Sequence, residues 1–297
     1  MSTMRFSHTA LLTLAASMAA SAQTPFVISN VHSALVLDLP AALATLDFTM
    51  IDQSTPSGGT NQQWTFHRPS GAQAYEILSV ASGMAIDVPS PVSGMTLQQW
   101  PANGSSDQLW QITRQLGEAG YEIASVNQVE KSSPVCGTGT LCTATYVPLV
   151  LDVPGFSTAE TMIQVYTENA GTNQQWNLQA VYPSLEAAVH LGHSISVSTG
   201  SAGATIDGSG FSANAEVCPV WESSPAFGVG FTTASCLTTS DLGTFTYTFP
   251  FPKRYTFAPP QTPLATTGYI VMTVEDKNQN LLAVGSVATT LYTSGPK

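Results

Sequence analysis

The sequence predicts an all-β chain made of two modules, and three observations support this prediction. Apolar residues come in short alternating runs broken by Gly, Pro and Asn, which is the pattern of strands and turns. A motif that ends in Trp occurs three times in the first half, at Trp64, Trp110 and Trp176. After Trp176 the motif stops but the alternation continues, so we expect a second β module there.

The composition narrows the classes of partner. The 297 residues include 8 Lys or Arg and 19 Asp or Glu, for a formal net charge of -11. Charged residues make up 9% of the chain, against roughly 25% in soluble proteins. The scarcity of positive charge argues against nucleic acid and against an anionic membrane surface as partners. The apolar share of 43% is enough to build cores, so hydroxyl and amide side chains supply the polar surface.

Residues 1–22 are predicted to be a secretory signal peptide. Arg5 supplies the positive charge, an apolar run follows, and Ala20 and Ala22 form an A-x-A cleavage site. The apolar run is too short to cross a bilayer, and no later segment approaches the ~20 apolar residues of a membrane span. We therefore expect a secreted, extracellular chain without a membrane span.

Export permits disulfides, and the chain has four cysteines. Four cysteines allow three pairings. We favour the two local bridges, Cys136 with Cys142 and Cys218 with Cys236, because short loops are cheap to close. There is no C-x-x-C spacing and no His close in sequence to a Cys, so we expect neither a metal site nor a cofactor.

Each of the three repeats combines the same two features. A strand ends on an Asp that is followed two residues later by Pro, at Asp38, Asp87 and Asp152. Farther along, a Gln stands two residues before the Trp. A unit of this size cannot close a core alone, but three units around a common axis can, each contributing one Trp.

The Q-x-W motifs, Gln62 with Trp64, Gln108 with Trp110 and Gln174 with Trp176, each behind an [IL]-D-[VL]-P strand, resemble the ricin B-type lectin domain. The resemblance covers roughly residues 24 to 180 and implies a β-trefoil in residues 23–181. It also implies sugar sites made of the strand-end Asp, a Gln two residues before an aromatic, that aromatic, and an Asn before the Q-x-W Gln. Such a set suits a neutral sugar, which offers hydroxyl groups and one apolar C–H face.

The second and third repeats retain this set to different degrees. The third repeat is complete, with Asp152, Gln164, Tyr166, Asn173 and Gln174. The second repeat has Asp87, Gln98, Trp100 and Gln108, with Asp107 in place of the Asn. An ionised Asp accepts hydrogen bonds and cannot donate, so we expect this site to prefer another hydroxyl arrangement or to bind more weakly.

The first repeat is predicted not to bind sugar. It keeps Asp38, Asn61 and Gln62, but the segment that should hold a Gln-x-aromatic reads FTMIDQS. For all three repeats a structural interpretation stays open. Asp before Pro is common in turns, and an Asn-Gln pair before Trp can serve packing alone.

Residues 182–297 loosely resemble an Ig-like β-sandwich module, through the segments 208–214, 241–249 and 268–276. Asp276, Asn278 and Asn280 have the spacing that opens a calcium loop, but the later positions lack the Gly and Glu, so we expect a hairpin turn. His190 and His193 are expected to be solvated.

Together these features predict a secreted, non-enzymatic lectin. Its partners would be neutral oligo- or polysaccharides and glycoconjugates of the galactose or xylose type, bound in two shallow sites. The alternative is the targeting module of a secreted glycoside hydrolase or toxin whose C-terminal half is active, although that half lacks G-x-S-x-G and H-E-x-x-H motifs. A third possibility is a structural protein whose trefoil has lost sugar affinity.

Overall fold

The structure is a computed structural model that describes residues 23–115, 117–131, 145–182, 192–222, 230–251, 255–256 and 264–293. The predicted signal peptide lies outside the described residues, and so do Cys136, Cys142 and His190. Within the described ranges the regular elements are β-strands and single turns of 3-10 helix, which confirms the all-β prediction. No helix in these ranges is long and apolar enough to cross a membrane.

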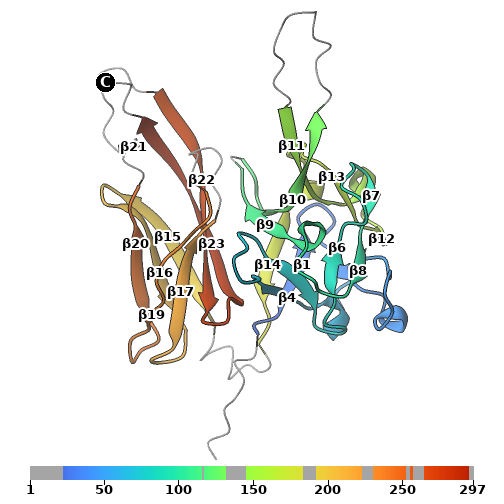
Figure 1. Cartoon of the computed structure of the whole chain (residues 1–297), viewed down its shortest axis with the longest axis horizontal. Coiled ribbons are helices and arrows are strands. Elements are labelled where there is room, and N and C mark those ends of the chain that lie inside the picture. Colours follow the sequence, from blue (N-terminus) through green and yellow to red (C-terminus); the bar gives the residue numbers. More distant parts are fainter. Residues whose placement is uncertain are drawn as a thin grey trace, which may run out of the picture.

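The first half of the chain forms one group of strands, drawn in blue to yellow in Figure 1. Its strands are β1 (Phe26–Asn30), β2 (Val36–Asp38), β3 (Asp52–Ser54), β4 (Trp64–His67), β5 (Glu76–Ser79), β6 (Ala85–Asp87), β7 (Met95–Thr96), β8 (Gln98–Trp100), β9 (Trp110–Thr113), β10 (Glu122–Lys131), β11 (Thr145–Asp152), β12 (Thr161–Met162), β13 (Gln164–Thr167) and β14 (Trp176–Ala180). The 3-10 turns η2 (Thr60–Gln62), η3 (Ser106–Gln108) and η5 (Thr172–Gln174) precede the three Trp-led strands, and η1 (Ala41–Leu43) and η4 (Pro154–Phe156) follow two of the strand-end Asp residues.

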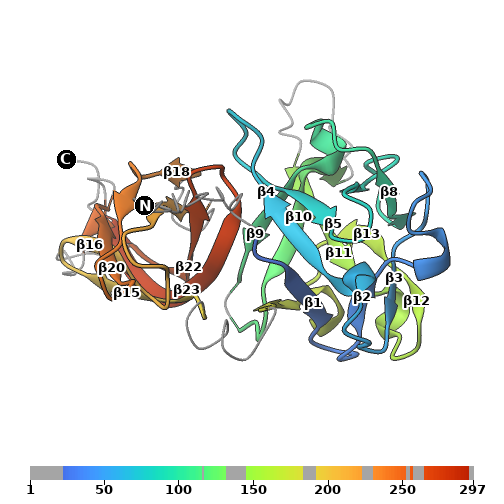
Figure 2. The same ribbon diagram turned by 90° about the horizontal axis from the view of Figure 1, so that it is seen from below.

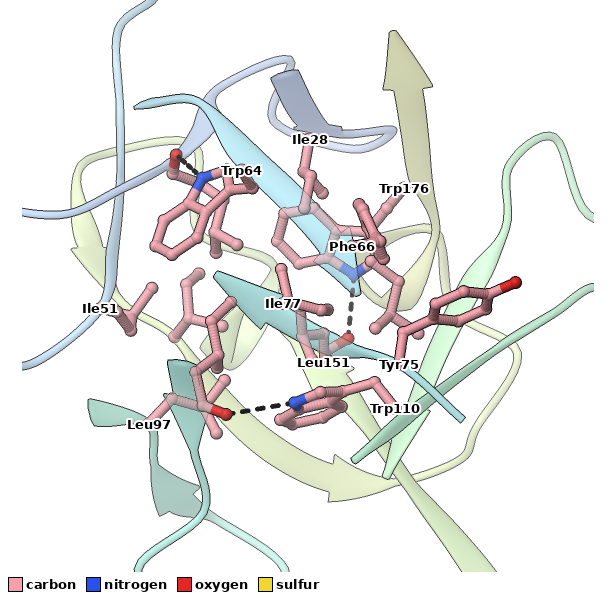
Figure 3. Packing of buried hydrophobic residues seen from close by; sticks show 14 of the residues in the cluster. Ile28, Ile51, Trp64, Phe66, Tyr75, Ile77, Leu97, Trp110, Leu151 and Trp176 are labelled. Carbon is pink, nitrogen blue, oxygen red and sulfur yellow. Dashed lines mark hydrogen bonds between the residues drawn. The ribbon is translucent and has the colours of Figure 1, made fainter. Parts of the chain in front are cut away.

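The three repeats are structurally equivalent at their Trp residues. Trp64, Trp110 and Trp176 are each 0% exposed and belong to one core. Each indole N–H donates to the carbonyl of the residue just before a strand-end Asp, at 3.0 Å to Leu37, 3.2 Å to Ile86 and 3.1 Å to Leu151. Figure 3 shows the three rings around a shared cluster of Ile, Leu and Phe side chains. The same indole bond thus ties the end of each repeat to its strand-end Asp segment.

The first and last strands of this half pair with each other. β1 runs antiparallel to β14, from Phe26 opposite Ala180 to Asn30 opposite Trp176. The start of the first repeat is therefore held against the end of the third, which closes the threefold arrangement in the way a barrel closes. This closure buries the apolar side chains of all three repeats in one core.

The second half contains two sheets, drawn in orange and red in Figure 1. One sheet holds β15 (Ser194–Gly200), β16 (Gly203–Ser209) and β20 (Phe245–Phe249); the other holds β17 (Glu216–Trp221), β18 (Thr232–Thr233), β19 (Leu237–Thr238), β21 (Tyr255–Thr256), β22 (Leu264–Asp276) and β23 (Leu281–Thr293). Side chains from both sheets share a second core. The Ig-like assignment and the boundary at residue 182 stay predictions.

Two local predictions for this half have definite outcomes. Cys218 and Cys236 form the predicted disulfide, which closes a loop with a sequence separation of 18. The expectation that His193 is solvated is wrong, because its ring stacks on Phe211 with centroids 4.5 Å apart. Burial of the His193 ring lowers its pKa.

Residues 276–280 form a hairpin turn, as expected. Asp276 Oδ1 accepts the backbone N–H groups of Asn278 at 2.8 Å and Asn280 at 2.9 Å, so the carboxylate is used to hold the turn. Within the part of the chain that the structure describes, no cluster of His, Cys, Asp and Glu residues could hold a metal ion.

The two halves meet through buried polar contacts. The Arg68 guanidinium of the first half forms an ion pair with Glu275 of the second, with Nη2 and Oε2 2.7 Å apart. The Tyr75 hydroxyl, which points away from the apolar cluster in Figure 3, donates to Glu222 at 3.0 Å. Both views agree that β9 lies on the side of the first half that faces β22 and β23 (Figures 1 and 2).

Candidate functional site

Strand pairing brings the predicted residues of the third repeat together. Asp152 is the last residue of β11 and lies opposite Gln164, the first residue of β13. Tyr166 follows two positions later and therefore shares the face of Gln164, because strand side chains alternate. The η5 turn carries Asn173 and Gln174 to the same strand end.

The Asp152 carboxylate is the centre of this site. It is 2% exposed and accepts hydrogen bonds from three side-chain amides. Gln164 Nε2 donates to Oδ2 at 2.7 Å, while Asn173 Nδ2 and Gln174 Nε2 donate to Oδ1 at 2.7 Å and 3.0 Å. Burial raises the pKa of Asp152, and the three amide bonds oppose that rise.

The two amides on η5 also hold the surrounding loops. Asn173 Nδ2 donates to the carbonyl of Val153 at 3.0 Å, and Gln174 Nε2 donates to the carbonyl of Thr167 at 3.1 Å. Gln174 Oε1 accepts the backbone N–H of Asn169 at 2.8 Å. Gln174 therefore has a structural role, in agreement with the packing interpretation of its motif.

Two further features of the third repeat bear on ligand binding. The Tyr166 ring is 41% exposed, so it can cover an apolar face. The Asn173 Oδ1 atom is buried and has no hydrogen-bond donor among the described residues. A buried carbonyl oxygen without a donor costs free energy, so a hydroxyl that reached it would be favoured.

The second repeat builds a similar but altered site. Gln98 Nε2 donates to Asp87 Oδ1 at 2.9 Å, and Gln108 Nε2 donates to Oδ2 at 3.2 Å. Asp107 takes the place of Asn173, and its backbone carbonyl accepts the N–H of Val88 at 2.9 Å. Its side chain brings a negative charge instead of an amide, and this charge adds to burial in raising the pKa of Asp87.

The aromatic residue of the second repeat has a neighbour that the sequence reasoning missed. The Trp100 ring lies against Phe48, with centroids 4.2 Å apart and planes inclined by 55°. Phe48 is 60% exposed and adopts a left-handed backbone with φ of 62°, which is uncommon for a bulky residue. Part of the Trp100 surface is therefore already covered by another repeat.

In the first repeat, a carboxyl group replaces the Gln of the other two. Asp38 lies opposite Asp52 in the strand register, where Asp152 faces Gln164. Ser54 stands at the position of the aromatic. Burial, and then the charge of Asp38, raise the pKa of Asp52 to about 7. The strand register, rather than the Q-x-W motif, identifies this substitution.

Comparison with a protein family supports the assignment of the first half. The model of a family described as "Ricin-type beta-trefoil lectin domain-like" matches residues 17–91 and 60–132. These stretches contain the first two Q-x-W motifs. No curated protein sequence matches the chain significantly.

Solved structures similar to about half of the chain include designed and natural proteins. The designed threefold-symmetric protein ThreeFoil is 26% identical, with a TM-score of 0.42 over 53% of this chain and 99% of its own. An exo-β-1,3-galactanase from Clostridium thermocellum is 30% identical, with a TM-score of 0.42 over 53% of this chain and 30% of its own. The ricin B-like lectin of Macrolepiota procera, solved with lactose, is 21% identical, with a TM-score of 0.39 over 52% of this chain and 94% of its own.

Proposed function

We propose that this chain, whose first half carries a ricin-type β-trefoil lectin-like domain, is a secreted and non-enzymatic carbohydrate-binding protein. Its main site is in the third repeat, a weaker site is in the second, and the first repeat does not bind. The observation that carries this proposal is the buried Asp152 carboxylate, oriented by three amides beside the exposed ring of Tyr166.

Each group has a separate task in the proposed site. Asp152 accepts hydrogen bonds from hydroxyl groups of a galactose- or xylose-type sugar. The amides of Gln164 and Asn173 donate to its carboxylate and so hold it in one orientation. Tyr166 covers the C–H face. Ring stacking adds only about 0.5 to 1.5 kcal/mol beyond the buried area, so each site is weak alone.

The second site matters because two weak sites can act on one polymer. When one site holds a polysaccharide, the other meets the same chain at a high effective concentration. Phe48 and Asp107 change the second site. We expect these changes to lower its affinity for sugar without abolishing binding. We assign the second half, as an Ig-like module, to spacing or adhesion.

The test compares the three strand-end Asp residues. Asp→Asn keeps the size of the side chain and removes its charge, so Asp152→Asn should weaken binding to galactose- or xylose-type polysaccharides by about 10- to 100-fold. Asp87→Asn should have a smaller effect, and Asp38→Asn, the matched control, should bind like the unaltered protein. Affinities are measured by calorimetry, after Trp fluorescence has shown that each variant is folded.

Three results would contradict the proposal. These are no binding of any neutral sugar by the unaltered protein, binding by Asp152→Asn as tight as that of the parent, and a loss of binding in Asp38→Asn as large as in Asp152→Asn. Release of reducing sugar by the purified protein would instead favour the alternative, in which the trefoil targets a glycoside hydrolase.

A further inference from the structure

A cavity of about 580 Å³ lies between the two halves of the chain, apart from the three repeat sites. Its first wall comes from β9, β10 and β11, and its second wall comes from β22. These strands face each other across the junction in Figures 1 and 2. The volume is within the range of ~300 to 1,000 Å³ that is typical of small-molecule sites.

The walls of this junction cavity carry aromatic and polar side chains. Tyr146, on the first wall, is 57% exposed, so its ring is available to a ligand. Tyr269, on the second wall, has the Arg114 guanidinium 4.6 Å from its ring centroid. Thr113 and Gln111 add a hydroxyl and an amide. A ring beside hydrogen-bonding groups is the combination that a sugar ring requires.

Two carboxyl groups, those of Glu122 and Glu168, line the cavity, and that of Glu118 lies close to Glu122. Gln115 Nε2 donates to both Glu122 and Glu168, which line the cavity, and thus holds their carboxyl groups close together. The backbone N–H of Gln115 donates to Glu118 at 2.6 Å. Arg114 lies nearby, but its guanidinium donates to Ser286 and to backbone carbonyl groups. This end of the cavity therefore carries an excess of acidic groups.

Glu122 has a buried carboxyl oxygen that lacks a hydrogen-bond donor among the described residues. It is 2% exposed, and its Oε1 atom receives no hydrogen bond from an N–H or hydroxyl group of any described residue. Burial, followed by the charges of Glu118 and Glu168, raises the pKa of Glu122 to about 9. Glu122 therefore keeps its proton at neutral pH.

We propose that the junction cavity binds a sugar that carries a primary ammonium group, that is, an unacetylated amino sugar. The ammonium group donates to Glu122 Oε1, beside Glu168, and the sugar ring packs against Tyr146. On binding, the Glu122 proton passes to solvent and the ammonium takes its place, so the charge balances. This proposal does not rest on the neutral-sugar sites of the repeats, because it uses none of their residues.

The test compares two oligosaccharides that differ in charge. A tetrasaccharide of glucosamine is titrated against the same tetrasaccharide of N-acetylglucosamine, at about pH 6, below the pKa of an ordinary α-amino group. The full chain carrying Asp87→Asn and Asp152→Asn is used, so that the repeat sites contribute little. We expect the charged sugar to bind about 10- to 100-fold more tightly, as a charge-assisted hydrogen bond to a buried carboxylate would provide.

Glutamine variants test which carboxyl groups are responsible. In the same background, Glu122→Gln and Glu168→Gln should each reduce the affinity for the glucosamine tetrasaccharide by about tenfold or more. Glu216→Gln makes the same Glu-to-Gln replacement at an exposed position on β17 and should change nothing. Tyr146→Ala should weaken binding several-fold, and its exposed side chain makes a folding defect unexpected.

The proposal is overturned if the glucosamine tetrasaccharide does not bind, or if the acetylated sugar binds equally well. It is also overturned if the two Glu variants and Tyr146→Ala all bind like their parent. None of these results bears on the Asp152 experiment, which uses neutral polysaccharides, so the two proposals can fail separately.

Discussion

The substitution Glu222→Gln at the junction of the two halves should change how the stability of the protein depends on pH. The Glu222 side chain is fully buried, and its Oε1 atom accepts hydrogen bonds from the hydroxyl groups of Tyr75 at 3.0 Å and Thr273 at 2.8 Å. Burial raises the pKa of Glu222 to about 8 from its ordinary value of 4.5. Glutamine has the same shape and remains neutral at every pH.

The direction of the effect follows from proton binding. Between about pH 4.5 and pH 8 the folded protein keeps the Glu222 proton, whereas the unfolded chain has lost it. The stabilisation from Glu222 is therefore complete below pH 4.5 and is lost as the pH rises to 8. Within this window the free energy of unfolding falls by up to about 1.4 kcal/mol per pH unit, or a few kcal/mol in all.

Urea unfolding at several pH values between 5 and 8 measures this effect, with fluorescence of the buried Trp residues as the signal. The unaltered protein should lose stability steadily across the range, whereas Glu222→Gln should lose distinctly less and become the more stable form near pH 8. Glu216→Gln, at an exposed position, controls for the change in net charge. If the curves of the unaltered protein and Glu222→Gln run parallel, the assignment of a buried proton to Glu222 is wrong.

Three further changes test other parts of the structure. Asp38→Asn removes the charge that lies opposite Asp52; it should lower the pKa of Asp52 from about 7, followed by NMR titration, and an unchanged pKa would refute the pairing. Replacing both Cys218 and Cys236 by Ser should cost roughly 3 kcal/mol of unfolding free energy in urea, and a loss well below 1 kcal/mol would contradict a constraining bridge. Trp176→Ala should cost about 3 to 5 kcal/mol by the same measurement, while a small loss would place its ring outside the core.

The parts of the fold that could be predicted from sequence are those that recur. Each Trp lies at the same place in its repeat, so one motif predicted three equivalent buried rings. The strand-end Asp and the Gln two residues before the Trp recur in the same way, and three of the amides expected at the third site, those of Gln164, Asn173 and Gln174, donate to Asp152. A local pattern that is repeated can be recognised because the same short-range interactions act each time.

The contacts that sequence reasoning missed join segments that are not equivalent. Phe48 of the first repeat covers Trp100 of the second, and nothing in the other repeats corresponds to this pair. Arg68 and Glu275 pair across 207 residues of chain, so no periodicity points to their contact. Asp52 replaces a Gln at a position that only the strand register makes apparent. Such contacts depend on how the repeats and halves pack rather than on the motif within each.

The scarcity of Lys and Arg bears on the interior as well as the surface. With 8 basic residues against 19 acidic ones, few cations are available to pair with carboxyl groups that folding buries. Asp52, Glu122 and Glu222 lie in three different places, and burial is the first cause of the raised pKa in each. Keeping a proton avoids most of the cost of a buried charge. Because all three groups lose that proton as the pH rises, we expect the protein to be more stable in mildly acidic than in alkaline solution.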